Sequence, residues 1–386
     1  MKMEDSVWDF SGEYSCPSYG RRAKMMDFNK AVFVRNPALL EPVKKHLWER
    51  RKGSPRQRPL GWKTASNMLD RLTLFAKHME GLGLRQWKDV TPEVWDELVS
   101  IIPADYNKCP MLRDAKGVLN APPEKEPLYY IPKSRYKPEK QTPPIPDYVM
   151  RAVVPKALAW EGRIPDLLRL RRNFDANDPW AQANGIRTPR DIKVAMGMGQ
   201  TAAMILLLAS TGMRVSELLS QTKGNGQMSG GLWHVWGTVF KFYGSGCRVR
   251  WFGGPMGMRA YQMLCDLSPV NDLCVSLWRA PNVITRHCVA WRMNNWLERE
   301  GIKGSDGNPV HLHPHQFRRT FARQLILHSK VTLLGLKDQF KHKKLSMTDY
   351  YIGCDIELYH ALLGRRLTTG MDKYAALLKK AEEECG

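Results

Sequence analysis

Apolar residues recur every three or four positions in two stretches of the first hundred residues. The first stretch, residues 64–80, predicts a helix whose apolar face consists of Met68, Leu72, Phe75 and Met79. A second helix is expected to begin at Thr91, a capping residue, with Pro92 in the first helical position, and to end at Pro103. Residues 1–55 show no strong period and are expected to form an N-terminal extension.

Prolines are concentrated between residues 103 and 146, where the sequence holds ten of them. Because proline interrupts helices and lacks a backbone donor for a sheet, this segment is expected to be poor in both elements and extended. Lysine and arginine residues are interleaved with the prolines. A basic, extended segment can follow a DNA backbone or can be a solvated linker, and the sequence leaves both interpretations open.

Helical periodicity returns over residues 147–172 and again at about 190–210, where the apolar run 202–209 predicts a buried helix. The pattern changes between Gly231 and Gly254, where two β-rich runs enclose a turn segment. These runs predict a β-hairpin. Most of the sequence beyond the hairpin has a helical pattern.

The elements together predict a mainly α fold with a small β-hairpin or sheet. A length of 386 residues is enough for two domains. The expected division is a helical domain over residues 56–175, which includes the proline-rich segment, and a mixed α/β domain over residues 176–360. Residues 361–386 are expected to form a tail helix.

The charge of the chain indicates the class of its partner. Lys and Arg total 59 against 38 Asp and Glu, which gives a net charge of +21. Such a charge favours nucleic acid, because neutralising phosphates releases counterions and gives affinity for any sequence. The alternative is a basic protein whose charge serves solubility alone.

Hydropathy and cysteine usage point to the cytoplasm. No apolar run approaches the roughly 20 residues of a membrane span, so no membrane partner is expected. The eight cysteines form no CxxC pair, and in a chain of this length they are interpreted as reduced thiols, not as a disulfide framework or a zinc site.

Candidate chemistry lies in three islands, residues 210–219, 313–325 and 340–351. In the second island His315 and Arg318 are three residues apart, so they lie on neighbouring turns of one helix face. This spacing places the guanidinium of Arg318, which can bind a phosphate, beside the imidazole of His315, which can transfer a proton.

The same island contains histidines in alternation, at His311, His313 and His315, a pattern that also occurs in metal sites. Pro314 interrupts the element, however, and no further ligand cluster accompanies the histidines. No metal is therefore expected.

The first island places Arg214 at the start of a helix, with Glu217 one turn later, an arrangement that is also common in surface ion pairs. In the third island His342 precedes Tyr351 by nine residues. Three lysines make the entry to this island basic, namely Lys341, Lys343 and Lys344. The alternative interpretation is a basic loop followed by two packed tyrosines.

The three islands resemble the signature boxes of the tyrosine recombinase (phage integrase) family. TGMRVSEL is similar to the first arginine box, HQFRRTFA to the HxxR box, and FKHKKLSMTDYY to the LGH box followed by T-x-x-Y. The last match aligns Thr348 and Tyr351, so Tyr351 and not Tyr350 takes the nucleophile position. The resemblance covers residues 185–360. Phe340 and Lys341 replace the leucine and glycine of the family's LGH box, and Arg319 stands where histidine is frequent.

The resemblance implies a catalytic set of Arg214, Lys241, His315, Arg318, His342 and Tyr351, supported by Glu217. Lys241, at the end of the first hairpin strand, matches the family's hairpin lysine. The resemblance and the local charge together assign DNA binding to Arg248, Arg250, Arg319, Lys341, Lys343 and Lys344. It also implies that residues 56–175 are the core-binding domain, that residues 176–360 are the catalytic domain, and that no cofactor or metal is needed.

The chemistry implied by the family requires these residue types. A phenol has a pKa near 10, so Tyr351 needs a base such as His315 to attack a phosphodiester. Arg214 and Arg318 would stabilise the charge of the pentacoordinate transition state, with a further hydrogen bond from His342, and Lys241 would protonate the departing 5′-oxygen.

The expected function is therefore site-specific recombination of double-stranded DNA, through a 3′-phosphotyrosyl intermediate, by a homotetramer assembled on DNA in the cytoplasm. Two rivals remain: a DNA-binding protein of the same fold that does not cut, and a type IB topoisomerase. An RNA-binding module is disfavoured, because the sequence lacks an aromatic sheet signature. The sequence does not distinguish integration, transposition and resolution, or identify accessory proteins.

Overall fold

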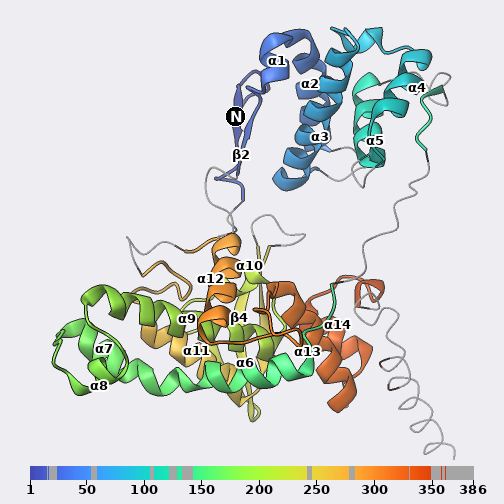
Figure 1. The fold of residues 1–386 in the computed structure, drawn as a ribbon. Coiled ribbons are helices and arrows are strands. Elements are labelled where there is room, and N and C mark those ends of the chain that lie inside the picture. Colours follow the sequence, from blue (N-terminus) through green and yellow to red (C-terminus); the bar gives the residue numbers. More distant parts are fainter. Residues whose placement is uncertain are drawn as a thin grey trace, which may run out of the picture. The chain divides into compact units, whose positions relative to one another are not determined.

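A computed structural model describes residues 1–14, 16, 24–53, 59–104, 108–120, 128–132, 142–240, 246–277, 283–329, 331–348, 358 and 361. The chain divides into two compact units (Figure 1). Unit 1 comprises residues 1–15 and 19–139, and unit 2 comprises residues 16–18 and 140–386. The predicted tail helix at 361–386 lies outside the described residues except for Ala361.

Unit 1 is a helical bundle with a short β-ribbon. Its strands β1 and β2 pair in antiparallel register, with Trp8 opposite Met26. Its elements are β1 (Val7–Asp9), β2 (Met25–Asp27), α1 (Ala31–Arg35), the 3-10 helix η2 (Pro37–Leu39), α2 (Leu40–Lys52), α3 (Trp62–Gly81), η3 (Trp87–Asp89), α4 (Pro92–Ile101) and α5 (Lys108–Leu119).

The predicted helices of unit 1 are confirmed. Helix α3 buries Leu72, Phe75 and Met79, and α4 begins at Thr91, whose side chain accepts a hydrogen bond from the backbone of Val94. The N-terminal extension differs from the expectation, because it is not a separate segment. Trp8 and residues of α2 belong to the same hydrophobic core as α3.

Helix α5 corrects the expectation that residues 103–146 are poor in helix and extended. Pro110 is the third residue of α5, in the first turn, where the missing N–H has no intrahelical partner to lose. Beyond it, Met111, Leu112, Ala115 and Val118 follow helical spacing and are buried. Burial of this apolar face therefore stabilises a helix that the number of prolines in the segment argued against.

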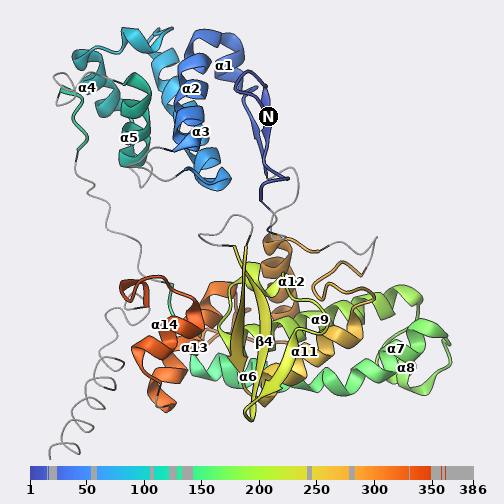
Figure 2. The same cartoon turned by 180° about the vertical axis from the view of Figure 1, so that it is seen from behind.

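Unit 2 is built around helix α9. Its elements are α6 (Asp147–Ala159), η5 (Glu161–Arg163), α7 (Ile164–Arg172), α8 (Pro179–Ala183), α9 (Pro189–Thr211), α10 (Val215–Leu218), β3 (Gly226–Ser229), β4 (Leu232–Val239), β5 (Cys247–Gly253), α11 (Pro255–Leu267), α12 (Arg286–Arg299), α13 (Pro314–His328) and α14 (Leu333–Phe340). Figure 2 shows the sheet of β3, β4 and β5 in front of α9 and α11.

Helix α9 is the predicted buried helix, and it contacts α6, α7, α11, α12 and α13. It starts with a reciprocal capping box between Thr188 and Asp191, and it ends at Gly212 in the left-handed conformation, with φ 64°. The helix is long and apolar enough to cross a membrane by composition, but 72% of its most apolar stretch is buried inside the protein. Its apolarity is accounted for by packing on all sides.

The predicted hairpin is confirmed as the antiparallel pair of β4 and β5, in which Val235 lies opposite Trp251. The third strand, β3, was not predicted, because its residues are mostly exposed and polar. It extends the hairpin into a three-stranded sheet with the order β3, β4, β5.

The division between the units differs from the predicted boundary at residue 175. Helices α6 and α7 belong to unit 2, since Val149, Val153, Leu167 and Leu170 are buried in the core that surrounds α9. The apolar faces of these two helices thus belong with the C-terminal unit, although the proline-rich segment precedes them in the sequence.

Candidate active site

The first part of the site forms where α9 ends. Arg214 is the N-cap of α10, and its backbone N–H donates to Oε2 of Glu217 at 2.6 Å. Its side-chain Nη1 donates to Oε1 of the same carboxylate at 2.7 Å. Glu217 is 1% exposed, whereas the side chain of Arg214 retains 15% of its surface. Glu217 therefore holds the backbone and the guanidinium of Arg214 together.

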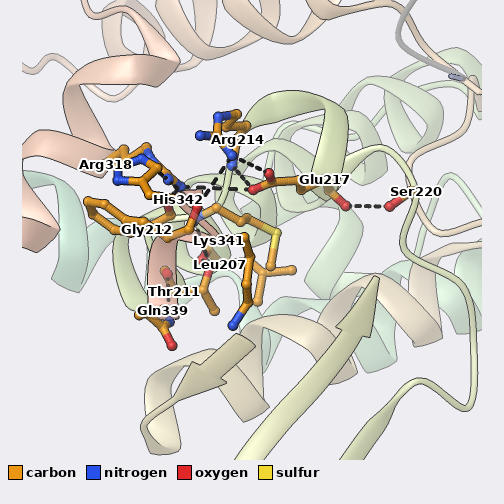
Figure 3. Close-up of polar contacts among 12 residues, drawn as sticks. Leu207, Thr211, Gly212, Arg214, Glu217, Ser220, Arg318, Gln339, Lys341 and His342 are labelled. Atoms are coloured by element: carbon orange, nitrogen blue, oxygen red, sulfur yellow. Dashed lines mark hydrogen bonds and ion pairs between the residues drawn. The ribbon is translucent and has the colours of Figure 1, made fainter. Parts of the chain in front are cut away.

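Arg318, on α13, is completely buried, with no exposed side-chain surface. Its Nη1 donates to the carbonyl of Gly212, and its Nη2 donates to the carbonyl of Phe340, both at 2.7 Å (Figure 3). The guanidinium carbon lies 3.8 Å from the centre of the Phe340 ring. Arg318 thus joins the end of α9 to the end of α14.

Glu217 also lies beside this second arginine, with its Oε2 3.9 Å from Nη1 of Arg318. A buried guanidinium is costly unless charge and hydrogen bonds compensate it. One carboxylate and two carbonyls supply that compensation here. The islands that contain Arg214 and Arg318 are therefore brought to one place, as predicted.

His342 completes the described cluster. Its Nε2 lies 3.1 Å from Nη2 of Arg318, and its Nδ1 lies 3.0 Å from the hydroxyl of Thr348. A guanidinium can only donate, so Nε2 must accept, and the ring proton is placed on Nδ1, which donates to Thr348. Thr348 is fully buried and stands three residues before Tyr351 in the sequence. The third island is thus tied to the first two by hydrogen bonds.

The matching family model covers residues 194–356, a range that includes every residue of this cluster, and it describes the phage integrase family. This part of the chain is similar to the phage integrase family. We call residues 194–356 the integrase domain.

Curated relatives of the chain include tyrosine recombinases named XerC. The XerC of Pseudomonas entomophila (strain L48) is 29% identical over 161 residues, which cover 40% of this chain and 48% of the relative. The XerC of Xylella fastidiosa (strain 9a5c) is 27% identical over 206 residues, which cover 50% of this chain and 60% of the relative. The chain therefore spans about half the length of the curated relatives it matches.

A solved structure extends the fold assignment beyond the integrase domain. The integrase of transposon Tn1549, solved in complex with circular intermediate DNA, aligns with 81% of this chain and 94% of its own, with a TM-score of 0.50 and 14% identity. This likeness establishes a shared fold, and it confirms the predicted fold class.

Gln339 positions the third island of the integrase domain and was not found from the sequence. Its side-chain amide donates to the carbonyls of Thr211 at 2.9 Å and Phe252 at 2.8 Å, and its oxygen accepts from the N–H of Phe252 at 3.2 Å. One buried amide thus connects α14 to the end of α9 and to β5. No local pattern signals such a role, because all of its partners are distant in sequence.

Lys341 follows α14 and is partly buried. Its ammonium donates to the carbonyl of Asp338 and lies 5.7 Å from the centre of the Trp251 ring. Burial is the main cause that lowers the pKa of Lys341 to about 8, opposed by the carboxylates of Asp338 and Glu217.

Three members of the predicted catalytic set remain. His315 is exposed in the first turn of α13, three residues before Arg318. Lys241 and Tyr351 lie outside the described residues, so their assignments remain predictions from the resemblance.

The structure describes the side chains of the other residues that were predicted to bind DNA. Arg248 and Arg250 are exposed on β5, and each guanidinium lies over an aromatic ring, Trp236 at 5.3 Å and Phe252 at 5.2 Å. Arg319 is partly exposed on α13, and the residues after Lys341 include two exposed lysines, Lys343 and Lys344. Within the described residues, no three His, Cys, Asp or Glu side chains gather as a metal site requires.

Proposed function

We propose that the protein is a site-specific DNA recombinase that cuts and rejoins double-stranded DNA through a 3′-phosphotyrosyl link to Tyr351. The observation that supports this most strongly is the cluster of Arg214, Glu217, Arg318 and His342 in the integrase domain. Thr348 connects this cluster to the segment that precedes Tyr351. A protein that only binds DNA has no need of this arrangement.

In the proposed reaction, the Tyr351 oxygen attacks the phosphorus of the scissile phosphodiester and gives its proton to His315. The bond from phosphorus to the 5′-oxygen breaks, and Lys241 donates a proton to that oxygen. The energy of the phosphodiester is kept in the protein link. A 5′-hydroxyl from a second duplex then attacks the link, releases Tyr351 and exchanges the strands.

Arg214 is the arginine of the cluster that keeps exposed surface, so it is assigned the first contact with the phosphate. His342 would donate to the same phosphate through Nε2, after the ring proton has moved from Nδ1 to Nε2 by exchange with solvent and the Thr348 hydroxyl has turned to donate to Nδ1. Because Nε2 accepts from Arg318 in the DNA-free protein, this contact must open when DNA binds. Arg318 would then turn its Nη2 from the histidine to a phosphate oxygen.

Assembly is part of the proposal, because exchange between two duplexes needs four active sites, and we propose a homotetramer on DNA in the cytoplasm. Residues 371–378 carry an apolar stripe at helical spacing, consisting of Met371, Tyr374, Leu377 and Leu378. A cavity of about 420 Å³ in unit 2 is a candidate receptor for the stripe. Its lining includes Met150, Met256, Phe321 and Leu325.

Covalent trapping on a nicked suicide duplex tests the function, and the duplex is built from the DNA that flanks the gene. The parent protein should give a protein–DNA adduct that survives denaturant. Tyr351→Phe should bind the duplex and give no adduct, while the control Tyr350→Phe should give the parental amount. Adduct formation by Tyr351→Phe would show that the nucleophile has been misassigned.

Two further measurements separate the rivals. A type IB topoisomerase would form the adduct and relax supercoiled DNA, but would not join strands of two duplexes. A DNA-binding protein without activity would form no adduct on any duplex it binds. Joined products from two labelled duplexes are the result that we expect.

A further inference from the structure

Lys341 has a backbone conformation that a lysine rarely adopts. Its φ of 56° and ψ of 42° are left-handed, and among the described residues only Asn120 shares a positive φ without being glycine. The N–H of Lys341 bonds the carbonyl of Asp338, and the N–H of His342 bonds the carbonyl of Lys337. This pattern ends a helix and favours glycine at the left-handed position. A non-glycine residue whose backbone is strained beside a candidate active site suggests that its side chain has a function there.

The position of Lys341 in the site indicates what that function is. The preceding residue, Phe340, offers its carbonyl to Nη2 of Arg318 at 2.7 Å and to Nη1 of Arg214 at 3.5 Å. The following residue is His342, which contacts Arg318. The lysine side chain therefore leaves the backbone between the two residues that bind the arginines of the site.

The charge of Lys341 is available to a ligand. Its hydrogen-bond partner, the Asp338 carbonyl, is neutral and does not cancel the cation. The charged groups that act on its pKa are Asp338 on α14 and Glu217 on α10, which raise it, and Arg250 on β5 and Arg318 on α13, which lower it. Glu217 is already bound to Arg214, so a phosphate entering the site would be a new anionic partner.

We propose that Lys341 is a further catalytic residue, whose ammonium leaves the Asp338 carbonyl and binds the scissile phosphate beside Arg214. This inference rests on the proposed function. In this role Lys341 adds a cation where negative charge develops in the transition state. Glycine at this position would avoid the left-handed strain but would lack the cation, so the catalytic role explains why a lysine stands there.

Three variants separate the charge of Lys341 from its backbone. Lys341→Gln has the same conformational cost as lysine and no charge, Lys341→Arg keeps the charge, and Lys341→Gly removes both the charge and the strain. We expect Lys341→Gln and Lys341→Gly to slow single-turnover cleavage of bound DNA by roughly tenfold or more. Lys341→Gly should also unfold at a higher temperature than the parent, and Lys341→Arg should keep most of the cleavage rate.

The pH dependence gives a second readout. The pKa of Lys341 is lowered to about 8, so the ammonium is present below pH 8 and is lost as the pH rises above it. Arginine keeps its proton throughout this range. The free protein's pKa governs the rate when the DNA is far from saturated with protein. Under that condition the cleavage rate of Lys341→Arg, divided by that of the parent, should therefore rise between pH 7 and pH 9. The control Lys337→Gln removes a neighbouring lysine of α14 and should leave the rate unchanged.

The two proposals fail in different ways. If the parent forms no adduct with any flanking duplex, the proposed function fails. If the parent forms the adduct and Lys341→Gln and Lys341→Gly cleave at the parental rate, the function stands and the inference about Lys341 is overturned. A constant ratio of Lys341→Arg to parent across pH would also overturn it.

Discussion

Replacement of Arg318 by alanine is predicted to destabilise the integrase domain as well as to stop cleavage. The variant removes the donor to two buried carbonyls, those of Gly212 and Phe340. Each buried acceptor left without a donor costs about 1–3 kcal/mol. It also removes the cation 3.9 Å from the buried carboxylate of Glu217, although Arg214 keeps its own bond to that group. Because these effects overlap, the free energy of unfolding should fall by about 3–5 kcal/mol.

Urea unfolding followed by circular dichroism measures this loss, and hydrogen exchange locates it. The two units can unfold separately, so the amides of α9, α13 and α14 should exchange faster in Arg318→Ala while those of α3 stay protected. The matched control is Arg259→Ala, which breaks an ion pair with Glu161 at the protein surface, where the two side chains are 46% and 38% exposed. It should change the unfolding little.

The same measurement distinguishes Arg318 from Arg214, whose guanidinium has fewer buried partners. Parental unfolding of Arg318→Ala, accompanied by loss of cleavage, would refute the structural part of the reasoning. Arg318 would then act only on the phosphate. Arg318→Lys should lie between the parent and alanine, because lysine keeps the charge but lacks the two-pronged guanidinium.

Two other predictions concern the third island and the tail. Thr348→Val leaves the Nδ1–H of His342 without its acceptor, so cleavage should slow while DNA binding persists, and ¹⁵N NMR of the histidine should show a changed tautomer population. Unchanged spectra and rates would remove Thr348 from the site. Deletion of residues 368–386 should leave single-site binding intact and abolish higher-order complexes in a gel shift, and Met256→Asp in the candidate receptor should do the same. Normal assembly by both variants would exclude the tail as the connector.

The sequence was sufficient for elements whose signals are local. Helix α4 was predicted from Thr91, Pro92 and an apolar stripe, and the hairpin was predicted from two β-rich runs around a turn. Helix α5 was missed because the number of prolines concealed that Pro110 lies in a first turn, where proline is tolerated. Strand β3 was missed because pairing with β4, and not burial, defines it.

The candidate site divides in the same way. Arg214 and Glu217 are three residues apart, so their contact could be predicted from helix geometry alone. The bond from Arg318 to His342 depends on how α13 meets α14, and the bridges made by Gln339 depend on β5 as well. The left-handed backbone of Lys341 could not be predicted from the sequence, because lysine rarely adopts that conformation.

The charges of the site favour the transition state of the proposed reaction over its ground state. Arg214, Arg318 and Lys341 are three cations near one carboxylate, Glu217, and His342 is a neutral ring in its Nδ1–H tautomer. A phosphodiester carries one negative charge, and the pentacoordinate transition state carries two. A site with two uncompensated positive charges therefore gains more from the second state than from the first, which is the condition for catalysis by electrostatic stabilisation. Glu217 limits the excess charge in the absence of DNA, and its loss would leave two arginines and a lysine to repel one another.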